Sequence, residues 1–255
     1  MKRAWFWVFA IGIILFIIAD SIAQNTSDSS YIPLVIVLGA MIVPVTFVIY
    51  FYEHIKDRDI SRLFLTICFV VGGGIGVGAA AIVEYNSLTT LDPGSLVVVG
   101  LIEESAKMIV PLAAFLFWRF RHEADGLIIG VTVGMGFAAL ETIGYGFSTL
   151  AQSNHSLNAV DQVLLFRGLL SPAGHAAWTG IVCAVLWRER ELAGQWVLNW
   201  KVILFFILAV ALHAAWDIVN SQNSNSVAYI GTTIIAAISL GTLISLYQEA
   251  RRRLI

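Results

Sequence analysis

The sequence of 255 residues contains eight apolar segments, each close to the ~20 residues that cross a lipid bilayer. Of its residues 58% are hydrophobic and only 13% are charged, against about 25% charged in ordinary soluble domains. Because a bilayer core offers the backbone no hydrogen-bond partner, such segments cross it as helices. We therefore predict an all-α fold, a polytopic transmembrane helix bundle of about eight spans, in one membrane domain of residues 1–255. The expected spans are 4–19, 32–52, 63–83, 95–118, 126–150, 162–187, 201–220 and 226–248.

The basic residues predict the orientation of these spans. Thirteen of the 15 Lys and Arg residues lie before the first span, after the last, or in every second loop. They are Lys2, Arg3, Lys56, Arg58, Arg62, Arg119, Arg121, Arg188, Arg190, Lys201, Arg251, Arg252 and Arg253. Since cytoplasmic loops carry the excess of Lys and Arg, both termini are predicted to be cytoplasmic. A net charge of −2 with no basic domain gives no sign of nucleic-acid binding.

The first segment has a second interpretation. Residues 1–23 combine two basic residues, an apolar run and small residues at the end, as a signal peptide does. The run is long for a signal peptide, so an uncleaved span is favoured. Cleavage would leave the orientation of the other seven spans unchanged.

Four successive spans carry ionisable side chains where lipid disfavours them. These residues are Glu103, Glu104 and Lys107, then Glu141, then His175, then His213 and Asp217. An acid or a basic side chain at mid-bilayer costs about 2.5–3.5 kcal/mol on the insertion scale. The four groups recur roughly every 35 residues, about one crossing plus a short loop. They are therefore expected to meet at a similar depth in one bundle.

Each group alone admits a structural interpretation. Glu103 and Lys107 share a helix face and could form an ion pair that only fixes packing, while Glu104 points about 100° away and needs another partner. His213 and Asp217 also share a face, as two metal ligands do, as a ligand and its supporting carboxylate do, or as a structural pair does. Glu141 and His175 are single polar groups. A glycine stripe at 126, 130 and 134 is predicted to pack helices closely.

The groups considered together favour a metal or a shared proton. Four acids in the spans face only two bases, Lys107 and Arg167, which leaves two negative charges when the histidines are neutral. Buried charges are paired or coordinate metals, and protonated acids would relieve the excess as well. Two histidines with a carboxylate suit Zn²⁺, with a further carboxylate as general base. A mechanism with carboxylates alone is also possible.

The four motifs in order resemble the PrsW family of intramembrane proteases. They read Glu103-Glu104-x-x-Lys107, Phe137-x-x-x-Glu141, His175 and His213-x-x-x-Asp217, within a four-helix catalytic core of residues 95–220. The related CAAX-processing type II prenyl endopeptidases share the double glutamate but have a histidine where this chain has Glu141.

The resemblance implies proteolysis of a membrane-anchored protein, which in the founding case is an anti-sigma factor. The catalytic residues would be Glu103, Glu104 and Lys107. The residues that bind a metal or the oxyanion would be Glu141, His175 and His213, with Asp217 as a further ligand or as the group that orients His213. A bacterial or archaeal cytoplasmic membrane is the expected location. The alternatives are a proton- or cation-coupled transporter and a membrane scaffold without catalytic activity.

Overall fold

The computed structural model describes residues 3–26, 28–55, 60–88, 92–117, 120–193, 199–222 and 224–253, and these residues form helices and short connections with no strand. This confirms the predicted all-α class. Of the basic residues that predicted the orientation, Lys2, Lys56, Arg58 and Arg119 lie outside the described residues. The cytoplasmic position of the termini stays a prediction.

Seven helical stretches are long and apolar enough to cross a membrane among the described residues. The chain is therefore a multi-pass membrane protein. Two of the stretches are interrupted by a short turn of another helix type, and a third begins with one. The stretches are α1 (Ala4–Thr26); η1 (Ser29–Tyr31) with α2 (Ile32–His54); α3 (Arg62–Ile67), η2 (Cys68–Gly72) and α4 (Gly73–Ser87); α7 (Glu123–Gln152); α8 (Leu157–Leu170), η3 (Pro172–Ala176) and α9 (Ala177–Ala193); α10 (Trp200–Asn220); and α11 (Asn225–Arg253).

The fourth predicted span, 95–118, is not one continuous helix. It is divided into α5 (Pro93–Lys107) and α6 (Ile109–Phe117), which meet at a turn on Met108. Pro111 explains the break, because proline has no N–H for the carbonyl of Lys107 and its ring crowds that carbonyl. The Met108 N–H bonds instead to the carbonyls of Ser105 and Ala106. The break places the Glu103–Lys107 motif in the last turn of α5.

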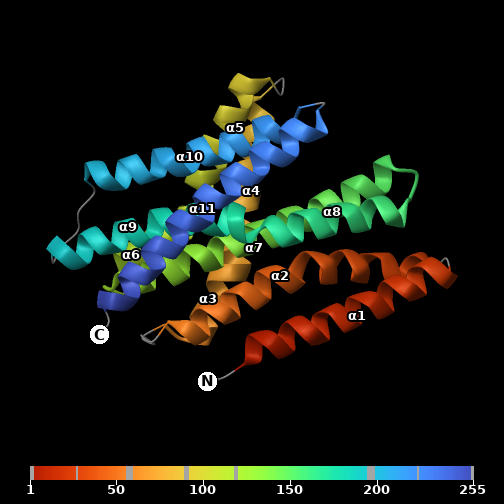
Figure 1. Cartoon of the computed structure of the whole chain (residues 1–255), viewed down its shortest axis with the longest axis horizontal. Helices are drawn as coiled ribbons and strands as arrows, with labels where there is room; N and C mark the ends of the chain where they lie inside the picture. The colour runs from red at the N-terminus through yellow and green to blue at the C-terminus, as the bar shows by residue number, and fades with distance from the viewer. Residues whose placement is uncertain are drawn as a thin grey trace. The chain divides into compact units, whose positions relative to one another are not determined.

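The helices form two compact units, and the prediction of one membrane domain stays a prediction. The first unit comprises Met1–His54 and Ala138–Pro172. In it α1 and α2 pair as a hairpin and α8 packs on α2 (Figure 1). Buried residues from these three helices form its core, which contains Ala19, Ala23, Val35, Ile36, Ala40, Val160 and Leu164.

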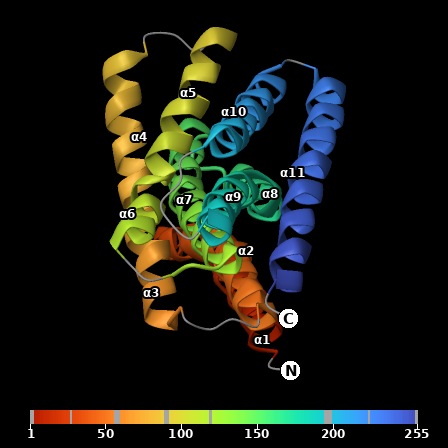
Figure 2. The same cartoon turned by 90° about the vertical axis from the view of Figure 1, so that its left-hand side faces the viewer.

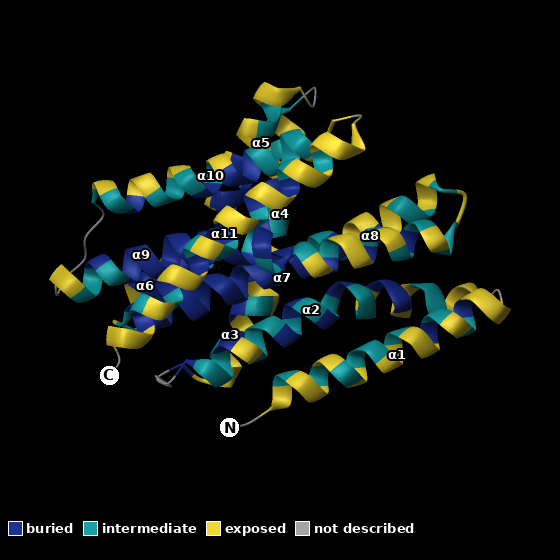
Figure 3. Cartoon of the chain, in the orientation of Figure 1, coloured by how far each residue is buried: buried dark blue, intermediate teal, exposed yellow. Residues whose placement is uncertain are grey.

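The second unit comprises Ile55–Phe137 and Ala173–Ile255. Within it α5 lies between α4 and α10 (Figure 2), and α11 packs on both α9 and α10. Burial is continuous over residues 123–137 of α7 and 177–187 of α9 (Figure 3). These two helical segments are the core of the unit.

The glycine stripe of α7 packs on α9. A Cβ atom on Gly130 would lie 2.6 Å from the Thr179 carbonyl oxygen and 2.7 Å from the Cys183 Cβ, and one on Gly126 would meet Trp187 at 2.7 Å. Real Cβ atoms do not approach so closely. The glycines therefore allow the close helix contact that the sequence predicted. This contact also fixes the position of the backbone that precedes α9.

Candidate active site

The last turn of α5 supplies two acids and a lysine to the second unit. The helix starts at Asp92, whose carboxylate accepts a hydrogen bond from the Ser95 N–H at 2.9 Å, with Pro93 in the first turn where a missing N–H does no harm. From this start, the helix carries its two acids and Lys107 into the interior. The Glu103 side chain is 10% exposed, that of Glu104 is 1% exposed and that of Lys107 is fully buried.

Lys107 contacts three acceptors at once. Its Nζ lies 2.8 Å from Glu104 Oε1, 3.2 Å from Glu103 Oε2 and 2.7 Å from His175 Nδ1. The sequence predicted the i, i+4 contact with Glu103 alone. The lysine reaches Glu104 as well, because residues three apart are also neighbours on a helix and its stem is flexible. One ammonium therefore neutralises part of a two-carboxylate charge.

His213 joins this cluster from α10. Its Nδ1 lies 2.9 Å from Glu104 Oε1, and its Nε2 lies 3.5 Å from Glu103 Oε2 and 3.5 Å from Asp217 Oδ2. The first distance is a hydrogen bond, with the Nδ1–H donating to the carboxylate. The face shared by His213 and Asp217 is confirmed by this geometry, and it turns the histidine toward both acids of α5.

His175 is delivered by a break in the helix between α8 and α9. Gly174 has non-helical angles of φ −99° and ψ −115°, two residues after Pro172, within the wide turn η3. Behind this turn, a Cβ atom on Gly134 of α7 would collide with the His175 carbonyl oxygen. Proline, glycine and the close approach to α7 together set the position of the histidine.

The contact with Lys107 determines which ring nitrogen of His175 carries the proton. An ammonium only donates hydrogen bonds, so His175 Nδ1 must be the acceptor in the 2.7 Å contact. The ring is then neutral with its proton on Nε2. His175 therefore presents an N–H donor on the side of the ring that does not face the lysine.

Aromatic rings enclose the cluster. The Trp178 ring stacks on His213 with centroids 4.6 Å apart, and its Nε1–H donates to Ser239 Oγ at 3.0 Å. The Phe137 ring lies under the Lys107 ammonium at 4.1 Å. These flat apolar surfaces remove bulk water from around the charges, which strengthens the interactions among them.

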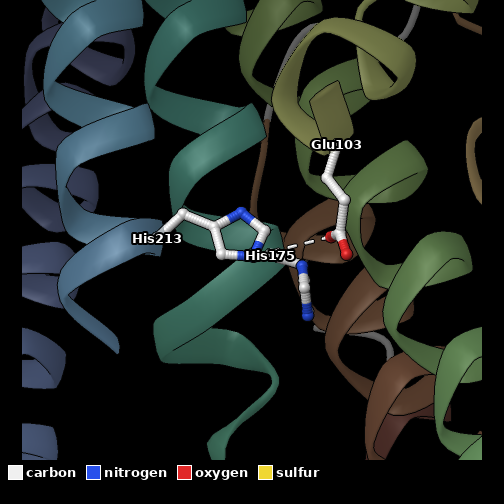
Figure 4. A group of neighbouring side chains, drawn as sticks. All are labelled: Glu103, His175 and His213. Atoms are coloured by element: carbon white, nitrogen blue, oxygen red, sulfur yellow. Dashed lines mark ion pairs between the residues drawn. The ribbon is translucent and has the colours of Figure 1, made fainter. Parts of the chain in front are cut away.

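Three ligand atoms gather closely enough for a metal ion. One atom each from Glu103, His175 and His213 lies within 4.8 Å of the others (Figure 4), and the side chains come from three different helical elements. Zn²⁺ binds nitrogen and oxygen ligands at about 2.0–2.2 Å, and a pair of histidines with one glutamate is a known catalytic ligand set. The residue types at this position are therefore ones that zinc binds, and Lys107 contacts two of the three.

Glu141 is in the other unit, together with the arginine that the sequence placed within a span. Arg167 Nη2 lies 2.6 Å from Glu141 Oε2, its Nε donates to Thr142 Oγ1 at 3.2 Å, and its guanidinium stacks over Tyr145 at 3.9 Å. The structure thus brings six of the seven predicted site residues together in one unit and pairs the seventh with Arg167. The role of Glu141 as a metal ligand stays a prediction.

Residues 61–243 match the protein family described as PrsW family intramembrane metalloprotease. The chain belongs to the PrsW family. It is 28% identical to Protease PrsW of Bacillus subtilis (strain 168) over 131 residues, which are 51% of this chain and 55% of that protein. It is 25% identical to Protease PrsW of Clostridioides difficile (strain 630) over 126 residues, 49% of this chain and 50% of that protein. The chain thus spans about half the length of the curated relatives it matches. No solved structure matches it.

The PrsW match extends from the cap of α3 into α11, so it contains all the residues of the cluster and leaves out α1 and α2. Two residues of the site, Phe137 under the lysine and Trp178 on His213, were not among the predicted site residues. Signals for both were present: Phe137 opens the PrsW motif that ends at Glu141, and Trp178 closes the peptide His175-Ala-Ala-Trp178, which is repeated from residue 213. Three residues along a helix bring a side chain back to the same face, so each tryptophan could reach the cluster.

Proposed function

We propose that this protein is an intramembrane endopeptidase that hydrolyses a peptide bond in a membrane-anchored protein. The observation that carries the proposal is the cluster of buried Glu103, Glu104, Lys107 and His213 with half-buried His175, whose polar atoms lie 2.7–3.5 Å apart. Ionisable residues inside membrane spans are costly and mark functional pathways or sites. Membership of the PrsW family supports the same reaction class.

In this proposal Glu103 is the general base. Its side chain is 10% exposed while that of Glu104 is 1% exposed, so an attacking water reaches it more readily. Its contacts to Lys107 at 3.2 Å and to His213 at 3.5 Å are longer than the 2.8 and 2.9 Å contacts of Glu104. A carboxylate in such a position takes a proton from water as the water attacks the carbonyl carbon, and then passes that proton to the leaving amine.

Glu104 is a positioning residue. Its Oε1 accepts from both Lys107 and His213, at 2.8 and 2.9 Å, inside a fully buried site. The carboxylate thereby fixes the proton of His213 on Nδ1 and turns Nε2 toward Glu103 and Asp217. This arrangement is the one by which a carboxylate orients a histidine in metal sites and in hydrolases.

His175 supplies an N–H for the developing negative charge. Because Lys107 occupies its Nδ1, the proton lies on Nε2, which can donate to an oxyanion. Donors held in place before the reaction stabilise the transition state without reorganisation, and removing one typically costs about 10²–10³ in rate.

The donor types are ones that bind a metal ion. With Lys107 displaced from Glu103 and His175, these two residues and His213 would hold a Zn²⁺ ion, and Glu104 at His213 Nδ1 would orient the ring. When bound, such an ion polarises a carbonyl oxygen and favours the hydroxide form of a coordinated water.

The substrate class follows from where the cluster lies. The site is in the helical, apolar part of a chain embedded in lipid, so the scissile bond belongs to a transmembrane or membrane-adjacent segment. A single-pass regulator, such as an anti-sigma factor, is the proposed partner. Cleavage of such a segment releases the attached soluble domain from the membrane.

A single reconstitution experiment tests the proposal. The purified chain and a single-pass reporter are placed in liposomes, and fragments are identified by mass spectrometry. Glu103→Gln and His213→Ala should abolish cleavage in protein that remains folded, whereas Asp28→Asn, in the exposed loop before α2, should not. Cleavage that persists in both site variants would overturn the protease assignment. Proton-dependent solute uptake by the same liposomes, without cleavage, would support the alternative of a transporter.

A further inference from the structure

The ammonium of Lys107 contacts side chains that could otherwise hold a metal ion. Its three acceptors, Glu103 Oε2, Glu104 Oε1 and His175 Nδ1, include two of the three residues that form the candidate metal group. We propose that Lys107 is the resident cation of this site and that its contacts exclude a divalent metal from the Glu103–His175–His213 donors. The proposal rests on the proposed function only in taking this cluster as the site of reaction.

The tautomer of His175 gives the first argument. A metal bound at Nδ1 has to displace the lysine, which lies 2.7 Å from that atom. A metal bound at Nε2 requires the ring proton to move to Nδ1, where it would point at the three N–H bonds of the ammonium. Both routes break the Lys107–His175 contact. His175 is therefore a poor ligand for as long as the lysine remains in place.

The charge of the cluster gives the second argument. Among the buried side chains, Glu103 and Glu104 carry two negative charges and Lys107 carries one positive charge, so with neutral histidines they sum to −1. Asp217, whose side chain is 27% exposed, adds a partly solvated negative charge 3.5 Å from His213 Nε2 and is not counted among them. A divalent ion would change this to a net +1, in a place where Lys107 is fully buried and Glu104 is 1% exposed. Without the lysine, the same ion would bring the site to neutrality. Buried sites strongly disfavour unbalanced charge.

The surroundings of the lysine give the third argument. The ammonium lies 4.1 Å from the centre of the Phe137 ring and 5.9 Å from that of Trp178, so its face away from the acids is also stabilised by electron-rich rings. The site is thus built around the lysine as a cation, and Glu103 remains a base rather than a ligand.

Zinc affinity, measured without substrate, tests the proposal. Lys107→Met keeps the length of the side chain and removes its charge, while Lys201→Met is a matched control at a lysine that is 41% exposed and paired with Glu189. Zn²⁺ is titrated by calorimetry into each purified protein in detergent, after chelator treatment. The expected result is that Lys107→Met binds one Zn²⁺ at least about tenfold more tightly than the wild type and the control, because like charges ~4 Å apart repel strongly even at the effective dielectric of proteins.

A second variant keeps the test decisive if Lys107→Met does not fold. Lys107→Met/Glu104→Gln removes one positive and one negative charge, so the net buried charge is unchanged while the three candidate donors remain. It should also bind Zn²⁺ at least about tenfold more tightly than Glu104→Gln alone. A wild-type protein that is purified with one tightly bound zinc, or a lysine variant that binds zinc no more tightly than its parent, would overturn the proposal. Cleavage assays on the same preparations report separately on the proposed function.

Discussion

Replacing each acid of α5 by glutamine separates the base from the positioning residue. Glutamine has the shape of glutamate without its charge, so Glu103→Gln and Glu104→Gln leave packing almost unchanged. The two variants differ in the contacts they weaken. Glu104→Gln removes the charge from two short hydrogen bonds, at 2.8 and 2.9 Å, whereas Glu103→Gln removes it from contacts of 3.2 and 3.5 Å.

The loss of stability follows from these contacts. A hydrogen bond to a charged group contributes about 1.5–3 kcal/mol, roughly twice the contribution of a neutral one. Halving the contribution of two such bonds in Glu104→Gln therefore lowers the free energy of unfolding by about 1.5–3 kcal/mol. The 3.2 Å bond of Glu103 is longer and its 3.5 Å contact is at the limit of a hydrogen bond, so Glu103→Gln should cost about 1 kcal/mol or less by the same reckoning.

Chemical unfolding in mixed micelles measures the stability, and the liposome cleavage assay measures the rate. Glu103→Gln should be nearly as stable as the wild type with cleavage reduced by about 10²–10⁴, the usual contribution of a general base. Glu104→Gln should be the less stable variant and should also lose activity, because His213 is no longer held. The division of roles is refuted if Glu103→Gln is the less stable of the two, or if it still cleaves at the wild-type rate.

Three further outcomes follow from the packing and the charges. Gly130→Ala should unfold at lower temperature and cleave more slowly than Gly78→Ala, because a Cβ meets backbone at the first position and nothing within 4 Å at the second. The free energy of unfolding is measured for Arg167→Leu, Glu141→Gln and the double variant. The loss in the double variant should differ from the sum of the single losses by about 0.5–3 kcal/mol, because the two side chains are in contact at 2.6 Å. Additive losses would show that this contact does not stabilise the fold. Chelator treatment should leave wild-type cleavage unchanged if Lys107 is the resident cation, and a loss restored by Zn²⁺ would contradict this.

The spans were predictable because apolar length is a local property. The sequence also contained the signal for the exception, since Pro111 lies four residues after Lys107, yet hydropathy over 95–118 averages across the break. A proline within a span is tolerated when other groups satisfy the freed carbonyl, so its presence alone does not predict a divided helix. Pro44, for example, lies inside helix α2, which continues past it without a break.

The cluster on α5 and α10 was predictable to the extent that helix periodicity determines it. Spacings of three and four residues place Lys107 beside both acids and His213 beside Asp217. Periodicity says nothing about which face of α10 meets α5, so the 2.9 Å bond between His213 and Glu104 became visible only in the structure. The position of His175 depends on non-helical angles at Gly174, which no spacing rule describes.

Glu141 and Glu104 illustrate why residue type alone could not divide the labour among the acids. Both are glutamates within apolar helices, and both have a basic partner at close range. Glu104 is paired with a lysine three residues away on its own helix, where the same ammonium also holds a histidine. Glu141 is paired with an arginine 26 residues further along the chain, whose planar guanidinium also bonds Thr142 and stacks on Tyr145. An arginine of this kind directs several of its N–H donors to one acid and the residues beside it. The lysine ammonium is a compact point charge, so several acids and a histidine can contact it at once. The choice of basic residue therefore predicts more than the acid does: a shared lysine favours a reactive cluster, and an arginine clamp favours a fixed contact.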